Sequence, residues 1–165
     1  MLHHHLQQQQ LIPFLFALKY QTPCFFFSQD PIQNMNIGGG AKVSNMRALV
    51  VDDNMVNQTI HHRLLQNLGI ENQVVKNGKE AVDVHSSGKY FDLILMDMDM
   101  PIMNGIEATR TLRAMGIRST IAGVSTRSLD QEKQEFMEAG LDDYQEKPLT
   151  KAKLVSILHK INHSG

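Results

Sequence analysis

From residue 46 onward, short apolar runs alternate with segments of helical periodicity, and this alternation limits the possible folds more than any other feature of the sequence. Strands that alternate with helices in this way form a parallel sheet covered by helices on both faces. The sequence therefore predicts an α/β domain of five strands and five helices. The expected strands cover residues 48–51, 74–75, 93–96, 120–124 and, more weakly, 143–146.

Helical segments follow these runs, and a glycine closes most of them. The first segment carries Val56, Ile60 and Leu64 on one apolar face and ends at Gly69. The last one begins after a threonine that can cap it. The later helices are expected at residues 79–85, 106–115, 129–139 and after Thr150, where Leu154, Ile157 and Ile161 recur at helical spacing.

Residues 1–45 differ in composition from the rest of the chain. They hold a histidine run, a glutamine run, a glycine run and few charged side chains, as is typical of a flexible leader. The apolar patch at residues 11–18 is shorter than the roughly 20 residues that a membrane span needs, and no Lys or Arg precedes it as in a signal peptide. We expect a low-complexity leader over 1–45, one domain over 46–165, and no membrane partner.

Charge and cysteine content bear on partners and compartment. Sixteen Lys and Arg against 17 Asp and Glu give a net charge of -1, so no basic field is present to hold nucleic acid without sequence specificity. The single cysteine, Cys24, has no partner for an intramolecular disulfide, which fits a reducing compartment. We expect a cytoplasmic protein, with the nucleus as a second location, that does not bind nucleic acid.

Polar residues gather where the expected strands end. The first strand ends in Asp52 and Asp53, and the third ends in Asp97. The fourth ends in Ser125, and the fifth ends just before Lys147. Alone, these residues are equally explained as helix caps and loop residues. Together they predict a site, because ligands bind at the carboxyl ends of the strands in an open parallel sheet.

The residue types at these strand ends favour phosphoryl chemistry. Carboxylates that converge on one pocket repel one another, and a divalent cation relieves the repulsion. Oxygen ligands suit Mg²⁺ rather than zinc. Lys147 and Ser125 are placed to meet phosphoryl oxygens by charge and by hydrogen bond, and an aspartate can act as the nucleophile.

Four motifs carry a family resemblance: L-V-V-D-D-N at 49–54, D-L-I-L-M-D-M-D-M-P at 92–101, G-V-S-T at 123–126 and D-Y-Q-E-K-P at 143–148. With them, residues 46–165 resemble the receiver domain of two-component response regulators. The segments F-M-E-A-G-L at 136–141 and E-K-P-L-T-K-A-K at 146–153 look like the type-C plant response regulators, receivers without an output domain. The resemblance implies a flavodoxin-like (βα)5 doubly wound parallel sheet with strand order 2-1-3-4-5.

The resemblance also implies a role for each acidic residue. Asp97 would be the phosphoacceptor and, with Asp53, a direct Mg²⁺ ligand. Asp52 would assist through a water molecule, and the backbone carbonyl of Asp99 would complete the ligands of the protein. Asp99 and Arg127 lie at positions where the family varies and where the lifetime of the phosphoryl group is tuned, so that lifetime stays open.

Three further positions match residues that the family uses for catalysis and switching. Ser125 stands where the family has a switch Ser or Thr, and Tyr144 stands where it has the switch aromatic residue. Lys147 stands where it has an invariant lysine. The resemblance therefore implies a complete receiver site.

The function implied by the resemblance is that of a monomeric phosphorelay receiver. It would take a phosphoryl group from the histidine of a phosphotransfer protein, and it would catalyse its own phosphorylation and dephosphorylation with Mg²⁺. The family partner docks on the first helix and the loops around the acceptor, so we expect Met55, Val56 and Pro148 to contact it. Two outcomes stay open: a phosphate drain that modulates cytokinin-type signalling, with phosphohistidine phosphatase-like activity towards the partner, or a contact switch with a long-lived phosphoryl-aspartate.

Two interpretations from other classes are less well supported. The D-M-D-M-P segment resembles the D-x-D motif of haloacid-dehalogenase phosphatases, but there the acidic pair comes last, whereas Asp52 and Asp53 precede Asp97. A histidine metal site could use His61, His62 and His85, or His159 and His163 at i, i+4 spacing. Two histidines on one face can bind adventitious metal, but a structural zinc site needs a third ligand nearby.

Overall fold

The computed structural model describes residues 45–126 and 130–163. Five parallel strands form one sheet in the order β2-β1-β3-β4-β5, so the expected α/β class and strand order are confirmed. The first expected residue of the fourth helix, Leu129, lies outside the described residues, as do residues 1–44 and Arg127. The elements are β1 (Arg47–Val51), α1 (Met55–Asn67), β2 (Glu71–Val75), α2 (Gly78–Ser86), β3 (Leu93–Asp97), α3 (Gly105–Ala114), β4 (Thr120–Ser125), α4 (Asp130–Glu138), β5 (Asp143–Glu146) and α5 (Lys151–His163).

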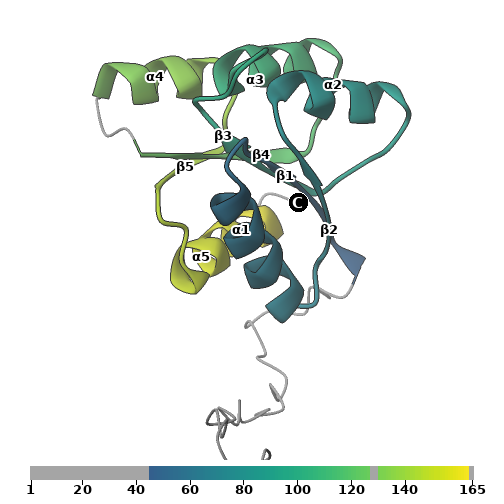
Figure 1. Ribbon diagram of the computed structural model, residues 1–165, viewed down its shortest axis with the longest axis vertical. Coiled ribbons are helices and arrows are strands. Elements are labelled where there is room, and N and C mark those ends of the chain that lie inside the picture. The colour runs from purple at the N-terminus through teal and green to yellow at the C-terminus, as the bar shows by residue number, and fades with distance from the viewer. Residues whose placement is uncertain (1–44, 127–129, 164–165) are drawn as a thin grey trace, which may run out of the picture. The chain divides into compact units, whose positions relative to one another are not determined.

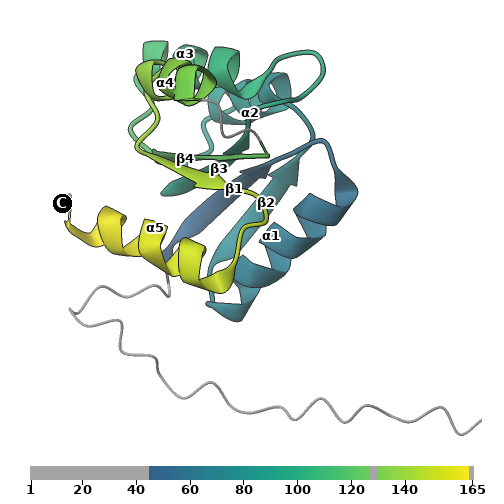
Figure 2. The same ribbon diagram turned by 90° about the vertical axis from the view of Figure 1, so that its left-hand side faces the viewer.

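Helices cover both faces of the sheet. Helices α1 and α5 lie on one face, and α2, α3 and α4 lie on the other (Figure 1, Figure 2). In β1, Leu49 and Val51 belong to the apolar core beneath α2, α3 and α4, whereas Ala48 and Val50 belong to the core beneath α1 and α5. Because helices cover β1, β3 and β4 on both faces, the sequences of these strands are continuous apolar runs.

The apolar face expected for the first helix is confirmed at Leu64, which packs against the core beneath α1 and α5, but is wrong at Val56 and Ile60. Val56 is 66% exposed and Ile60 is 39% exposed, whereas His61 and Leu65 are buried against the sheet. The side of α1 that faces the sheet begins one residue later than expected, at the half-buried Asn57, and includes polar side chains. The periodicity of apolar residues could not identify this side, because Asn57 and the buried His61 occupy helix positions that are usually apolar.

Parallel pairing brings the ends of the strands to one edge of the sheet. Val51 of β1 pairs with Met96 of β3, so Asp52 and Asp97 follow at the same level. The segment after β3 packs closely on the strand: a Cβ atom added to Gly105 would lie 2.1 Å from the carbonyl oxygen of Asp97. Glycine at this position therefore lets α3 begin directly against the strand that carries Asp97.

Among the helices in residues 45–126 and 130–163, none has both the length and the apolar character to cross a membrane.

Candidate functional site

Three carboxylates converge at the carboxyl edge of the sheet. Asp52 and Asp53 follow β1, and Asp97 is the last residue of β3. One oxygen from each carboxylate lies within 4.8 Å of the other two. Asp52 and Asp97 are buried, and Asp53 is exposed. The sequence predicted this convergence from the strand ends alone.

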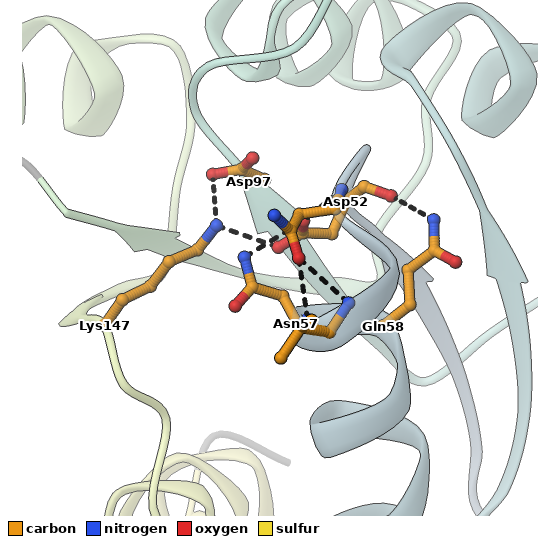
Figure 3. Close-up of polar contacts among 7 residues, drawn as sticks. Asp52, Asn57, Gln58, Asp97 and Lys147 are labelled. Atoms are coloured by element: carbon orange, nitrogen blue, oxygen red, sulfur yellow. Dashed lines mark hydrogen bonds and ion pairs between the residues drawn. The ribbon is translucent and has the colours of Figure 1, made fainter.

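Lys147 connects two of these carboxylates. Its Nζ lies 2.8 Å from Oδ2 of Asp52 and 2.9 Å from Oδ1 of Asp97 (Figure 3). The backbone of Lys147 is tied to β4, because its N–H donates to the carbonyl oxygen of Ser125 at 2.8 Å. The side chain of Lys147 thus extends from the segment after β5 to the ends of β1 and β3.

A second lysine fixes the segment that carries Lys147. The Nζ of Lys153, in α5, donates to the carbonyl oxygens of Glu146 at 2.5 Å and of Pro148 at 3.2 Å. These two carbonyls flank Lys147 in the chain. Lys153 therefore holds the backbone of the loop on both sides of the site lysine.

Residues of α1 hold Asp52 from its other side. Oδ1 of Asp52 accepts a hydrogen bond from the backbone N–H of Asn54 at 2.9 Å and one from Nδ2 of Asn57 at 3.3 Å. Gln58 donates from Nε2 to the carbonyl oxygen of Asp52 at 2.6 Å (Figure 3). Sequence reasoning missed Asn57 and Gln58. The available signal was two amide side chains in the first turn of a helix that directly follows an acidic pair.

Burial sets the electrostatics of the Asp97 carboxylate. The pKa of Asp97 is raised to about 6, mainly because burial disfavours the ionised carboxylate, and Asp52 and Asp53 raise it further by repulsion. The ammonium of Lys147 acts in the opposite direction. For Lys147 itself, burial works against the charged form, but the hydrogen bonds to Asp52 and Asp97 outweigh it and raise its pKa. The pair is therefore charged at neutral pH.

One ammonium among three carboxylates leaves the pocket with an excess of negative charge. All three acidic side chains offer oxygen atoms, which are the ligands that Mg²⁺ prefers. Asp52 already accepts hydrogen bonds on both of its carboxylate oxygens. The residues present therefore fit a hard divalent cation, with Asp53 and Asp97 as the carboxylates less occupied by hydrogen bonds from α1.

The remaining expected site residues belong to β4, to β5 and to the segment after β3. Ser125 is buried at the end of β4. Asp99 is exposed in the segment between β3 and α3. Tyr144 is half-buried in β5, packs against the core beneath α2, α3 and α4, and has Nζ of Lys133 5.4 Å from its ring centroid.

Exposed apolar side chains occur in the segments that follow β1, β3 and β5. Met55 is 77% exposed and Val56 is 66% exposed at the start of α1, and Pro148 is exposed beside Lys147. Ile102, in the segment after β3, is 82% exposed, and sequence reasoning did not single it out. Each of the three segments that follow the strands of the acidic residues and of Lys147 therefore carries an exposed apolar side chain.

The histidines considered as metal ligands have other surroundings. His61 is buried in α1, and burial lowers its pKa to about 4, so the ring is neutral at neutral pH. Nδ1 of His62 lies 2.6 Å from Oδ1 of Asn72. In the described part of the chain, the acidic trio is the only group of three acidic, histidine or cysteine side chains close enough to share a metal ion.

Comparisons with known proteins agree with this geometry. Residues 48–159 match the response regulator receiver domain. Two-component response regulator 24 of Arabidopsis thaliana is 71% identical over 119 residues, which cover 72% of this chain and 86% of the relative. The Arabidopsis thaliana two-component response regulator ARR22 is 44% identical over 115 residues, which cover 68% of this chain and 81% of the relative.

A solved structure resembles the fold as well. The receiver domain of a sensor histidine kinase from Pseudomonas aeruginosa, solved with a magnesium ion coordinated in its active-site cleft, is 34% identical with a TM-score of 0.65. The alignment covers 72% of this chain and 98% of that domain. The sequence match, the strand order and the acidic pocket lead to one conclusion: the chain belongs to the response regulator receiver family, and its similarity to plant regulators is consistent with the type-C group.

Proposed function

We propose that this chain is a phosphorelay receiver that accepts a phosphoryl group on Asp97 from the histidine of a phosphotransfer protein. Receiver domains of two-component systems exchange phosphoryl groups with histidine kinases or phosphotransfer proteins. The observation that carries the proposal is the ammonium of Lys147, which lies between Oδ1 of Asp97 and Oδ2 of Asp52. A cation held beside a buried carboxylate can meet a phosphoryl oxygen without leaving the pocket.

The transfer is an in-line displacement at phosphorus. A carboxylate oxygen of Asp97 attacks, the P–N bond to the histidine of the donor breaks, and the imidazole leaves with the electron pair and takes up a proton. Lys147 balances charge on the phosphoryl oxygens, and the buried Ser125 at the end of β4 is the expected hydrogen-bond donor to them. Fixed geometry supplies much of the acceleration.

Mg²⁺ is the cation that we propose for the acidic trio. Asp53 and Asp97 would bind it directly, Asp52 through a water molecule, and Asp99 through its backbone carbonyl. Two observations support this assignment: the hydrogen bonds that already occupy both oxygens of Asp52, and the magnesium ion in the related kinase receiver. When bound, the ion neutralises the carboxylates and the phosphoryl oxygens.

The partner surface that we propose is the apolar rim of the pocket. Met55, Val56 and Pro148 are all exposed at the edge where Asp97 lies. Isolated apolar side chains are common on surfaces, but three around one reacting group suit a transient contact with another protein. The domain would act as a monomer in the cytoplasm or nucleus, within cytokinin-type signalling.

The fate of the phosphoryl group distinguishes two forms of this function. As a drain, the domain would hydrolyse phosphoryl-Asp97 as fast as it forms, and the exposed carboxylate of Asp99, two residues from the acceptor, supports this form because it can orient water. As a contact switch, it would keep the group and move Tyr144, which packs inward with Lys133 over its ring. As a drain, the domain would lower the amount of phosphorylated partner.

A turnover experiment tests the proposal and separates the two forms. Sub-stoichiometric receiver is mixed with a phosphotransfer protein labelled on its histidine, and both proteins and free phosphate are followed. Many phosphates released per receiver indicate a drain, and one persistent label per receiver indicates a switch. If no label leaves the partner and none reaches the receiver, the proposed function is wrong. The Asp97→Asn protein is the matched control for release that does not pass through the acceptor.

A further inference from the structure

Ile102 occupies a strained turn between the acceptor strand and α3. The N–H of Met103 donates to the carbonyl oxygen of Pro101 at 2.8 Å, which closes a three-residue γ-turn with Ile102 at its centre. The φ angle of Ile102 is 73°. A γ-turn with positive φ is the rarer and more strained of the two forms, and a β-branched side chain adds to the strain.

The folded chain gains little from an isoleucine at this position. Its side chain is 82% exposed, so it contributes almost nothing to either core. Within residues 45–126 and 130–163, it is the only non-glycine residue with a positive φ. Glycine or asparagine would adopt the same backbone at lower cost. A strained and exposed apolar residue indicates a functional role, because neither packing nor backbone preference explains the isoleucine.

The strained turn is fixed relative to Asp97. The N–H of Gly105 donates to the carbonyl oxygen of Met98 at 2.9 Å, which closes the segment onto the end of β3. The N–H of Gly78, at the start of α2, donates to the carbonyl oxygen of Met103 at 3.0 Å. The turn is therefore anchored on both sides, and Ile102 lies in a fixed segment that directly follows the strand carrying Asp97.

We propose that Ile102 is an apolar anchor for the protein that donates the phosphoryl group. The inference rests on the proposed function and adds a specificity-determining residue to it. A small phosphoryl donor in water would gain nothing from this side chain. A phosphotransfer protein gains when an apolar surface beside its phosphohistidine covers Ile102, because burial of an exposed apolar side chain at an interface stabilises the complex. The exposed Met55 and Val56 extend the same kind of surface at that edge.

Substitution by asparagine separates strain from binding. Ile102→Asn removes the apolar side chain and fits the positive φ, so the melting temperature should rise by a few degrees. Transfer from the labelled phosphotransfer protein, measured as kcat/KM, should nevertheless fall about fivefold or more, mainly through KM. Mg²⁺ affinity and phosphorylation by phosphoramidate, a small donor, should stay within about twofold of the parent.

Two controls keep the result interpretable. Ile102→Val retains an apolar, β-branched side chain, so it should transfer within about twofold of the parent and melt at the same temperature. Tyr90→Ala removes another exposed apolar side chain, 56% exposed and located before β3 at the opposite edge of the sheet, and should leave transfer unchanged.

The outcomes distinguish this inference from the proposed function. If the parent accepts label and Ile102→Asn accepts it at the same kcat/KM, the anchor role is wrong while the receiver function stands. If Ile102→Asn is equally slow with phosphoramidate and with the protein donor, the residue supports the pocket instead of the partner, and the inference also fails. If the parent accepts no label, the proposed function itself fails.

Discussion

The ammonium of Lys147 lies 2.9 Å from Oδ1 of Asp97, although the two residues belong to segments at the ends of strands that are not neighbours in the sheet. The side chain of Lys147 spans the end of β4 to reach the end of β3. This ion pair keeps a buried carboxylate ionised at neutral pH, because Lys147 opposes the effect of burial on the pKa of Asp97.

Removal of this ammonium should change both the titration and the chemistry of the acceptor. In Lys147→Met the stem of the side chain is kept but the charge is lost, so the pKa of Asp97 should rise above its value of about 6 in the parent. Transfer should fall by about a hundredfold or more, because a preorganised cation at the phosphoryl oxygens is lost. An NMR titration of the Asp97 carboxyl group and a transfer assay measure the two effects. An unchanged pKa would contradict the role of the ion pair.

The raised pKa of Asp97 also makes stability depend on pH in the metal-free protein. Below about pH 4 the carboxyl is protonated in both the folded and the unfolded state, so it has no effect. Between its ordinary pKa of 3.8 and its folded value of about 6, the unfolded state ionises first, so this group lowers stability as pH rises. Above about pH 6 the loss is complete.

Asp97→Asn should therefore melt higher than the parent at pH 7 without metal, by a few degrees, and should lose this advantage as the pH falls to 4. Saturating Mg²⁺ should stabilise the parent more than the variant, since the cation favours the ionised carboxylate. Thermal melts at several pH values, with and without Mg²⁺, provide the measurement. A variant that melts lower than the parent at pH 7 without metal would contradict the destabilising effect of burial and acidic repulsion on the ionised Asp97.

The proposed metal ligands make different predictions for two exposed aspartates. Asp53→Ala removes a direct carboxylate ligand and should weaken Mg²⁺ binding by about tenfold or more. Asp99→Ala keeps the backbone carbonyl that would bind the ion, so its affinity should stay within about threefold of the parent. Calorimetric titration with Mg²⁺ measures both affinities under the same conditions. Equal losses in the two variants would contradict the ligand assignment.

Residues 1–44 should not take part in the transfer. The family match begins at residue 48, and each proposed site residue lies after it. Deletion of residues 1–44 should therefore leave the rate of transfer to Asp97 within about twofold of the full chain. The measurement is the same transfer assay, with circular dichroism to verify folding. A truncated protein that folds but accepts phosphate several-fold more slowly would show that residues 1–44 contribute to the transfer.

Much of the site could be predicted from the sequence because the carboxyl ends of parallel strands lie at the same edge of the sheet. The acidic pair after β1, the acid that ends β3 and the lysine after β5 are close in space for that reason alone. Their hydrogen bonds could not be predicted in the same way. Asn57 reaches Asp52 because the side of α1 that carries Asn57 and His61 faces the sheet. The periodicity of apolar residues places His61 on the solvent-facing side of the helix instead.

The strained turn was also beyond sequence reasoning. Positive φ is expected at glycine or asparagine, and the glycines that close α1, α2 and α3 follow that expectation. Ile102 does not, because isoleucine has no intrinsic preference for this conformation. Its backbone is imposed by the hydrogen bonds that fix residues 98–105 to β3 and α2, and these depend on the tertiary fold.

The most direct test of the account is transfer of label from a phosphotransfer protein to the full chain, followed by mass spectrometry of the product after borohydride trapping of the acyl phosphate. The account predicts that label appears only with Mg²⁺, that the trapped residue is Asp97, and that Asp97→Asn takes up none. Label on any other residue, or unchanged labelling of Asp97→Asn, would contradict the assignment of Asp97 as the phosphoryl acceptor.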